Sequence, residues 1–216
     1  MSSKKGQKGN HFPSTLIAIK NFLLQSNIKL SKSFDDGRIN SSFNEKEIIH
    51  LIRANFNISV PKARSWHDFS FIENDIFYPV NIKITETNSA DNLNVKLGIY
   101  YALTGLMPDF HNEIDWLTYF SKLRENINTY INKDYYFLVL NKNDAKDIFI
   151  NSLKGLRKLT PNGNNLPFQC KWKENKEFQK RSHASASKFI LKTFGESIKL
   201  RSEIYFNFKK YFPEYV

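Results

Sequence analysis

Three polar side chains lie on two short apolar segments that are typical of neighbouring β-strands. Asp68 falls within residues 65–72, and Asn81 and Lys83 fall within residues 78–85. Because side chains alternate along a strand, Asn81 and Lys83 point to one face and the apolar residues beside them point to the other. A hairpin formed by the two segments would bring Asp68 and Lys83 together. The spacing therefore predicts a polar cluster on one face of a β-hairpin.

These side-chain types suit a divalent cation held beside a phosphate. The Asp68 carboxylate can ligate Mg²⁺, which prefers oxygen ligands and retains several waters. The amide oxygen of Asn81 can coordinate a metal without adding charge, and the Lys83 ammonium can stabilise a phosphate oxygen or an attacking hydroxide. Taken alone, the pairing of Asp68 with Lys83 is more typical of a surface salt bridge. The presence of Asn81 on the same face favours the metal site.

A second acid is available on the preceding predicted helix. Glu45 lies one turn before Ile48 and Ile49, on the apolar stripe expected to pack against the sheet. An acid on such a stripe is costly unless something pairs with it. Capping of a helix that begins at Ser42 is the alternative explanation of Glu45. Glu47, angled further round the helix, is the poorer candidate for the same role.

The rest of the chain supplies a mixed set of elements around this hairpin. Apolar periodicity predicts helices over residues 13–25, 41–56, 94–105, 112–127 and 184–208, the last as one or two helices. An almost continuous apolar run over residues 134–141 predicts a strand buried on both faces. Further strands are expected from residue 149 and over residues 168–172, with loops or turns at residues 73–75, 87–92 and 160–167 and a short helix or turn at 143–148. The pattern indicates an α/β layered fold.

Several short motifs together resemble the PD-(D/E)xK nuclease superfamily, and the chain is similar to a type II restriction endonuclease. The motifs are Asn44–Ile49, Trp66–Phe69, Val80–Lys83, Asn94–Gly98 and Tyr135–Leu140, in that order. The resemblance implies a restriction-endonuclease-like core, with a central mixed β-sheet flanked by helices, and Mg²⁺-dependent hydrolysis of double-stranded DNA. It also implies that Asp68, Asn81 and Glu45 bind the metal, with Lys83 as the catalytic lysine.

Two positions depart from the family pattern. His67 replaces the proline that precedes the aspartate, and Asn81 replaces the second acid, which leaves the site one negative charge poorer. Either Asn81 is a working neutral ligand, or metal affinity is lost and the protein only binds DNA. The retention of Glu45 and Lys83 favours the working site. A repair or junction-resolving nuclease with the same residues is the nearest alternative.

The composition indicates a basic protein, and its single cysteine fits a reducing compartment. The chain has 216 residues, a net charge of +11 and one cysteine, Cys170, which excludes an internal disulfide. We expect a basic arm over residues 1–12 and one nuclease domain over residues 13–216, with its catalytic core over 38–142. No apolar run is long enough for a membrane span. A cytoplasmic protein of a prokaryote is expected.

The basic charge is concentrated beyond the expected catalytic core. Residues 151–216 contain fourteen Lys or Arg and five Asp or Glu, a net charge of +9, which indicates a surface that faces a polyanion. Within residues 155–216 and just after the hairpin we expect base-reading and phosphate contacts. The candidates are Lys96, Asn162, Asn164, Asn165, Gln169, Lys171, Lys173, Lys180 and Arg181, with Lys176, His183 and Lys188 as further phosphate contacts.

The C-terminal segment is also rich in aromatic residues, which we expect to be mainly core, with some available for a dimer face. They are Phe189, Phe194, Tyr205, Phe206, Phe208, Tyr211 and Phe212. The resemblance implies a homodimer acting on palindromic DNA. A companion DNA methyltransferase that forms no stable complex with the chain would complete such a system.

Overall fold

A four-stranded mixed sheet forms the centre of the molecule. The computed structural model describes residues 11–26, 37–110 and 115–216, with only the backbone described over 37–43. The sheet has the order β1-β2-β4-β5, in which β2 and β4 run parallel and the outer pairs run antiparallel. These strands are β1 (Phe69–Glu73), β2 (Ile76–Thr85), β4 (Tyr136–Asn141) and β5 (Asp144–Ser152). A second, two-stranded sheet pairs β3 (Ala90–Leu93) with β6 (Phe168–Lys171).

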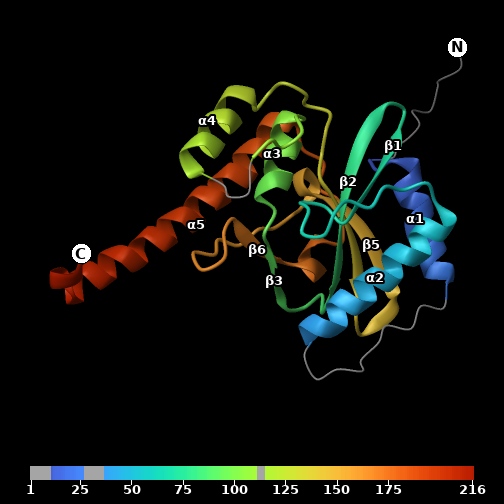
Figure 1. The fold of residues 1–216 in the computed structure, drawn as a ribbon, viewed down its shortest axis with the longest axis horizontal. Coiled ribbons are helices and arrows are strands. Elements are labelled where there is room, and N and C mark those ends of the chain that lie inside the picture. Colours follow the sequence, from blue (N-terminus) through green and yellow to red (C-terminus); the bar gives the residue numbers. More distant parts are fainter. Residues whose placement is uncertain (1–10, 27–36, 111–114) are drawn as a thin grey trace, which may run out of the picture.

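Helices cover both faces of the central sheet (Figure 1). The helices are α1 (Ser14–Gln25), α2 (Gly37–Asn55), α3 (Lys96–Thr104), α4 (Trp116–Asn126) and α5 (His183–Tyr211), with short 3₁₀ turns η1 (Leu153–Gly155), η2 (Trp172–Asn175) and η3 (Pro213–Tyr215). α1 and α2 lie on one side, and α3, α4 and α5 lie on the other. The predicted α/β class, with a mixed central sheet flanked by helices, is confirmed.

The central strand β4 contributes to two separate apolar clusters. Phe137 and Val139 pack with the α3, α4 and α5 side of the sheet, where Trp172 is also fully buried. Tyr136 and Leu138 pack on the opposite side with α1 and α2. Burial on both faces is the reason for the continuous apolar run in this segment, because neither face of β4 meets solvent.

The β1–β2 hairpin has the turn that its sequence predicts. Asn74 and Asp75 adopt left-handed backbone conformations, with φ of 51° and 60°, which Asn and Asp tolerate better than other non-glycine residues. The turn fixes a register in which Phe69 lies opposite Val80. Asp68, immediately before β1, therefore comes opposite Asn81, and the Asp68 amide donates to the Val80 carbonyl at 2.9 Å.

Three local expectations were wrong. Residues 90–93 form strand β3 instead of a loop, and residues 144–148 belong to β5 instead of a short helix or turn. β3 is mostly polar because one side of it meets solvent, so it lacks the apolar alternation of a typical strand. Helix α2 begins at Gly37. Ser42 therefore lies inside the helix, and the capping explanation of Glu45 is excluded.

The long C-terminal helix α5 is packed only in its first half. Ile190 and Phe194 are buried against the body, whereas every residue from Lys199 to Val216 is exposed. Phe206 is 63% exposed and Tyr211 is 71% exposed, so the expectation of a C-terminal aromatic core was wrong beyond Phe194. Figure 1 shows the second half of α5 projecting away from the sheet. None of the helices in residues 11–26, 37–110 and 115–216 is long and apolar enough to cross a bilayer.

Candidate active site

Asp68 is the centre of a hydrogen-bonded group at the edge of the sheet. One of its carboxylate oxygens, Oδ2, accepts from the Asn81 side chain at 2.7 Å and from the Ile82 backbone amide at 2.6 Å. β1 begins one residue later, so β2 has no strand partner on this side beyond Val80 and its Ile82 amide is free to bind a side chain. The hairpin therefore holds Asp68 in contact with Asn81. The spacing predicted an approach of Asp68 to Lys83, but among the described residues Lys83 forms its ion pair with Asp91 instead.

Asn81 uses only its nitrogen in this contact. Its Oδ1 atom is buried and accepts no hydrogen bond from any described residue. A buried carbonyl oxygen without a partner costs about 1–3 kcal/mol, so such an atom in a folded protein calls for an explanation. A bound cation beside the Asp68 carboxylate would provide one. The donor chemistry of this pair therefore fits a hard divalent metal.

Lys83 extends from the same face of β2 as Asn81. The parallel register places Asn81 beside Phe137 and Lys83 beside Val139, both on the α3 side of the sheet. The Lys83 side chain is 21% exposed, and its Nζ lies 3.9 Å from the Asp91 carboxylate on β3. The same Asp91 oxygen accepts from the Trp172 indole at 2.7 Å. Asp91 is thereby fixed and can hold the ammonium group in position.

Glu45 approaches the hairpin from the third turn of α2. Burial, followed by the nearby Asp68 carboxylate, raises the pKa of Glu45 from 4.5 to about 7, and the Lys83 ammonium partly opposes this. Burial likewise raises the pKa of Asp68, against the Ile82 amide and Lys83. The electrostatic coupling indicates that Glu45, Asp68 and Lys83 share one neighbourhood. Glu47, the other helix acid, is exposed.

Replacement of Glu45 by glutamine is expected to stabilise the fold at alkaline pH. The folded pKa of about 7 exceeds the unfolded value of 4.5, so the folded state binds more protons and wild-type stability falls as pH rises through this window. The shift alone corresponds to about 3 kcal/mol, and solvent access reduces the expected gain to about 1 kcal/mol. Urea unfolding at pH 5 and pH 8 measures it. Glu47→Gln is the matched control, and an equal gain there would contradict the coupling.

A pocket of about 460 Å³ opens beside the two acids. Glu45 and Asp68 line one part of it. The rest is lined by Lys46 and Ile49 of α2 and by the loop between α2 and β1, which includes Lys62 and Arg64. His67 also lines the pocket; its ring is buried between Trp66 and Phe77, and burial lowers its pKa to about 4. His67 is therefore neutral near pH 7 and contributes no charge to the site.

The predicted base-reading segment is largely engaged in its own hydrogen bonds. The Asn162 side chain donates to Asn92 and to Gln169 at 3.0 Å each, and its oxygen accepts from the backbone amides of Asn164 and Asn165. These contacts shape a loop beside β3 and β6. The side chains of Asn164 and Asn165 remain exposed, as do Lys171 and Lys173.

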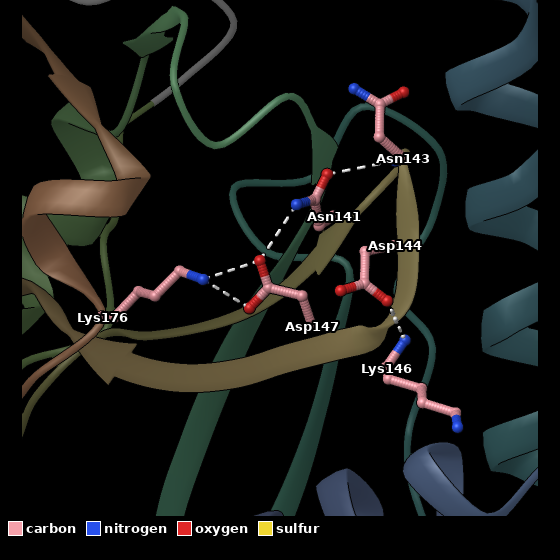
Figure 2. A network of polar contacts seen from close by, with 6 residues as sticks. All are labelled: Asn141, Asn143, Asp144, Lys146, Asp147 and Lys176. Carbon is pink, nitrogen blue, oxygen red and sulfur yellow. Dashed lines mark hydrogen bonds and ion pairs between the residues drawn. The ribbon is translucent and has the colours of Figure 1, made fainter.

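Some of the predicted phosphate contacts are bound to other protein groups, and others are exposed. Arg181 donates to the Leu156 carbonyl at 2.7 Å and stacks on Phe189. Figure 2 shows Lys176 bound to the Asp147 carboxylate, at 2.6 Å and 2.7 Å, in the network around the β4–β5 turn. Lys96 donates to Asn94 at 2.7 Å. Lys180 and Lys188 are exposed.

Asp91 is the residue of this site that sequence reasoning missed. It lies in a segment expected to be a loop. The apolar alternation of its partner strand β6 is the sequence signal that could have identified residues 90–93 as a strand. Phe168 and Cys170 on β6 alternate inward, and Cys170 lies opposite Asp91. A strand at residues 168–171 needs a partner, and residues 90–93 provide it.

The donor set at the hairpin fits Mg²⁺ in number and kind. No group of three or more His, Cys, Asp or Glu side chains with metal-binding geometry occurs in the described part of the chain. Two carboxylates and one amide oxygen remain, and Mg²⁺ sites commonly use one or two protein carboxylates while water supplies the other ligands. Asp68, Glu45 and Asn81 therefore supply the kinds of donor atom that such a site uses.

Comparison with known protein families finds no match for this chain, and a search of curated proteins finds no significantly similar relative. The assignment of a function therefore depends on the geometry of the site.

Proposed function

We propose that the chain is a Mg²⁺-dependent endonuclease of the type II restriction class, with a restriction-endonuclease-like core, which hydrolyses phosphodiester bonds of double-stranded DNA at a specific sequence. The observation that carries the proposal is the Asp68–Asn81 contact on the hairpin, with Glu45 of α2 and Lys83 of β2 near enough to act on Asp68 electrostatically and Glu45 lining the same pocket as Asp68. A buried amide oxygen without a hydrogen-bond partner among the described residues, on Asn81, lies beside two acids of raised pKa, Glu45 and Asp68. Perturbed pKa values of this kind are typical of functional sites.

In this proposal the chain's own groups divide the work between metal and phosphate. Asp68, Glu45 and the Asn81 oxygen hold Mg²⁺, with Asp68 kept in orientation by the Ile82 amide. When bound, Mg²⁺ supplies charge neutralisation at the phosphate and lowers the pKa of a water. Lys83, held by Asp91, presents its ammonium to a non-bridging phosphate oxygen and orients the attacking water. Its fixed position means that little reorganisation is needed during reaction.

The basic C-terminal third provides the expected DNA surface. Residues 151–216 carry a net charge of +9, and Lys171, Lys173, Lys180 and Lys188 are exposed. Their contacts with phosphates would position the duplex. A homodimer would place two sites on the two strands, and the exposed second half of α5 is the apolar surface available for it.

Digestion of a sequenced plasmid tests the proposal directly. Purified protein with Mg²⁺ should give discrete fragments whose mapped ends share one sequence, and chelation of the metal with EDTA should stop cutting. Cleavage of branched DNA alone would instead indicate a junction-resolving nuclease. Binding that is steeply salt-dependent, without cutting in Mg²⁺ or Mn²⁺, would sink the enzyme assignment.

The Asn81→Asp variant is expected to retain or increase cleavage. A carboxylate at this position restores the missing negative charge beside Asp68, so we expect half-maximal rate at a lower Mg²⁺ concentration. Initial rates across a Mg²⁺ titration measure this, with Asn143→Asp on the exposed β4–β5 turn as the control. Total loss of activity would show that Asn81 is not a metal ligand.

One observation favours a second candidate, a DNA-binding protein without catalysis. Asn81 is neutral where an acid is expected, and its nitrogen is hydrogen-bonded to Asp68 at 2.7 Å. If that bond replaces the metal, the site is a purely structural hydrogen-bonded group. The Asn81→Asp variant separates the two candidates, because only a metal site responds to it with a change in Mg²⁺ requirement.

A further inference from the structure

The pocket beside the two acids has a second wall that the proposed mechanism does not use. The loop from Val60 to Ser65 forms this wall, and Lys62 and Arg64 are both exposed on it. Lys46 of α2, next to Glu45, also lines the pocket. Three cations therefore line a space that is also lined by Glu45 and Asp68, together with His67 and apolar residues.

Among the residues whose side chains are described, these three cations have no carboxylate at ion-pair distance. Within residues 11–26, 44–110 and 115–216, no ion pair joins Lys46, Lys62 or Arg64 to a carboxylate other than the electrostatic attraction of Lys46 to its neighbour Glu45. Arg64 also has a left-handed backbone, with φ of 66°. An arginine rarely adopts that conformation, so the backbone of the loop is strained at this residue.

The pocket's charge pattern fits a phosphate diester. Lys62 and Arg64 on the loop, with Lys46 on α2, attract an anion, and a divalent cation held by Glu45 and Asp68 would strengthen that attraction without being required for it. The volume of about 460 Å³ lies in the range of small-ligand sites and has room for one nucleotide unit of a strand. A carboxylate ligand would satisfy the cations but would give no reason for the metal-binding wall.

We infer that this pocket binds the sugar-phosphate backbone of one DNA strand next to the scissile bond, with Lys62, Arg64 and Lys46 contacting its phosphates. The inference rests on the proposed function for the position of the reacting phosphate. It names a substrate-binding loop outside the basic C-terminal third. Phosphate contacts of this kind act regardless of base sequence, and each adds about 0.9 to the slope of log affinity against log salt.

The test is the salt dependence of duplex binding by the double variant Lys62→Ala with Arg64→Asn. Asparagine tolerates the left-handed backbone at position 64, so the variant should fold, and thermal unfolding checks this. Binding is measured by fluorescence anisotropy in EDTA, where no strand is cut. The slope of log affinity against log salt should be smaller in magnitude by about 2, and the affinity near 0.1 M salt should be roughly ten- to a hundredfold weaker. Lys62→Arg with Arg64→Lys should restore the slope.

The matched control removes the same charge elsewhere. Arg53→Ala with Lys146→Ala changes two exposed cations outside the pocket and should leave the slope within about 0.5 of wild type. Equal losses in the two double variants, or no loss in the pocket variant, would overturn the inference. Displacement of DNA by micromolar mononucleotide or inorganic phosphate would overturn the strand assignment, as would a pocket-dependent preference for single-stranded RNA.

These outcomes are separate from those of the proposed function. If the wild type never cuts DNA but the salt dependence of binding is weaker in the pocket variant, the pocket binds the DNA backbone and the nuclease proposal fails. If the wild type cuts DNA and the pocket variant binds and cuts equally well, the nuclease proposal stands and the pocket assignment fails.

Discussion

Replacement of Asp68 by asparagine is expected to reduce plasmid cleavage by at least about a thousandfold. Removal of the central metal ligand should cost about 4 kcal/mol of transition-state stabilisation, which corresponds to that factor. The fold should remain, because an asparagine oxygen can still accept from the Ile82 amide that Asp68 now binds at 2.6 Å. Single-turnover cleavage in Mg²⁺ measures the rate, and anisotropy in EDTA should show duplex binding that is unchanged or tighter, since a negative charge beside the phosphate is lost.

Asp75 provides the control for this experiment. It lies in the turn of the same hairpin, at φ of 60°, where asparagine is also tolerated. Asp75→Asn makes the same chemical change and should cleave DNA at the wild-type rate. Cleavage by Asp68→Asn within tenfold of wild type would remove Asp68 from the metal site.

Replacement of Lys83 by methionine is expected to have an effect of similar size. Methionine fills the same space between β2 and β3 but lacks the ammonium that would stabilise the phosphate, and loss of one such electrostatic contact typically costs about a hundred- to a thousandfold in rate. Of the two contacts that the Asp91 carboxylate makes with described residues, the change leaves the 2.7 Å bond to Trp172. The rate constant for cleavage at saturating DNA is the measurement.

For Lys83 the control is Lys142→Met. Lys142 forms an exposed ion pair with Glu86 at 3.0 Å, and such pairs contribute about 0–1 kcal/mol, so activity should persist. Undiminished cutting by Lys83→Met would refute its catalytic role. A loss that appears only in the affinity for DNA would reassign Lys83 to substrate binding.

The hairpin could be predicted from sequence because its information is local. Alternation of polar and apolar residues fixed which face of β2 carries Asn81 and Lys83, and the turn residues Asn74 and Asp75 fixed the register that sets Asp68 opposite Asn81. The continuous apolar run of β4 likewise follows from burial on both faces. In each case a periodicity of two, or its absence, reports directly on which faces are covered.

Features that depend on distant partners could not be predicted in the same way. β3 has little apolar alternation, and it becomes a strand only because β6 pairs with it from about eighty residues further along the chain. The Lys83–Asp91 contact was therefore missed. The side-chain network of Asn162 depends on Asn92 and Gln169, so composition alone could not separate a base-reading loop from a self-bonded one.

The aromatic C-terminus shows a different limit of sequence reasoning. Tyr205, Phe206 and Phe208 have the composition of a core, yet α5 passes beyond the body before it reaches them. Apolar side chains predict that a surface will be buried, but they do not show whether it packs against the same chain or against another molecule. A surface of this kind is where a second molecule would bind.

The bond between the Ile82 amide and the Asp68 side chain gives the site a built-in spectroscopic probe. Most strand amides donate to a neighbouring strand, but this one donates to a carboxylate at 2.6 Å. Its proton resonance should therefore lie far downfield and move when the charge on that oxygen changes. In a ¹⁵N-labelled sample, one cross-peak would follow cation occupancy during a titration, and its deuterium exchange rate would follow the integrity of the hairpin edge.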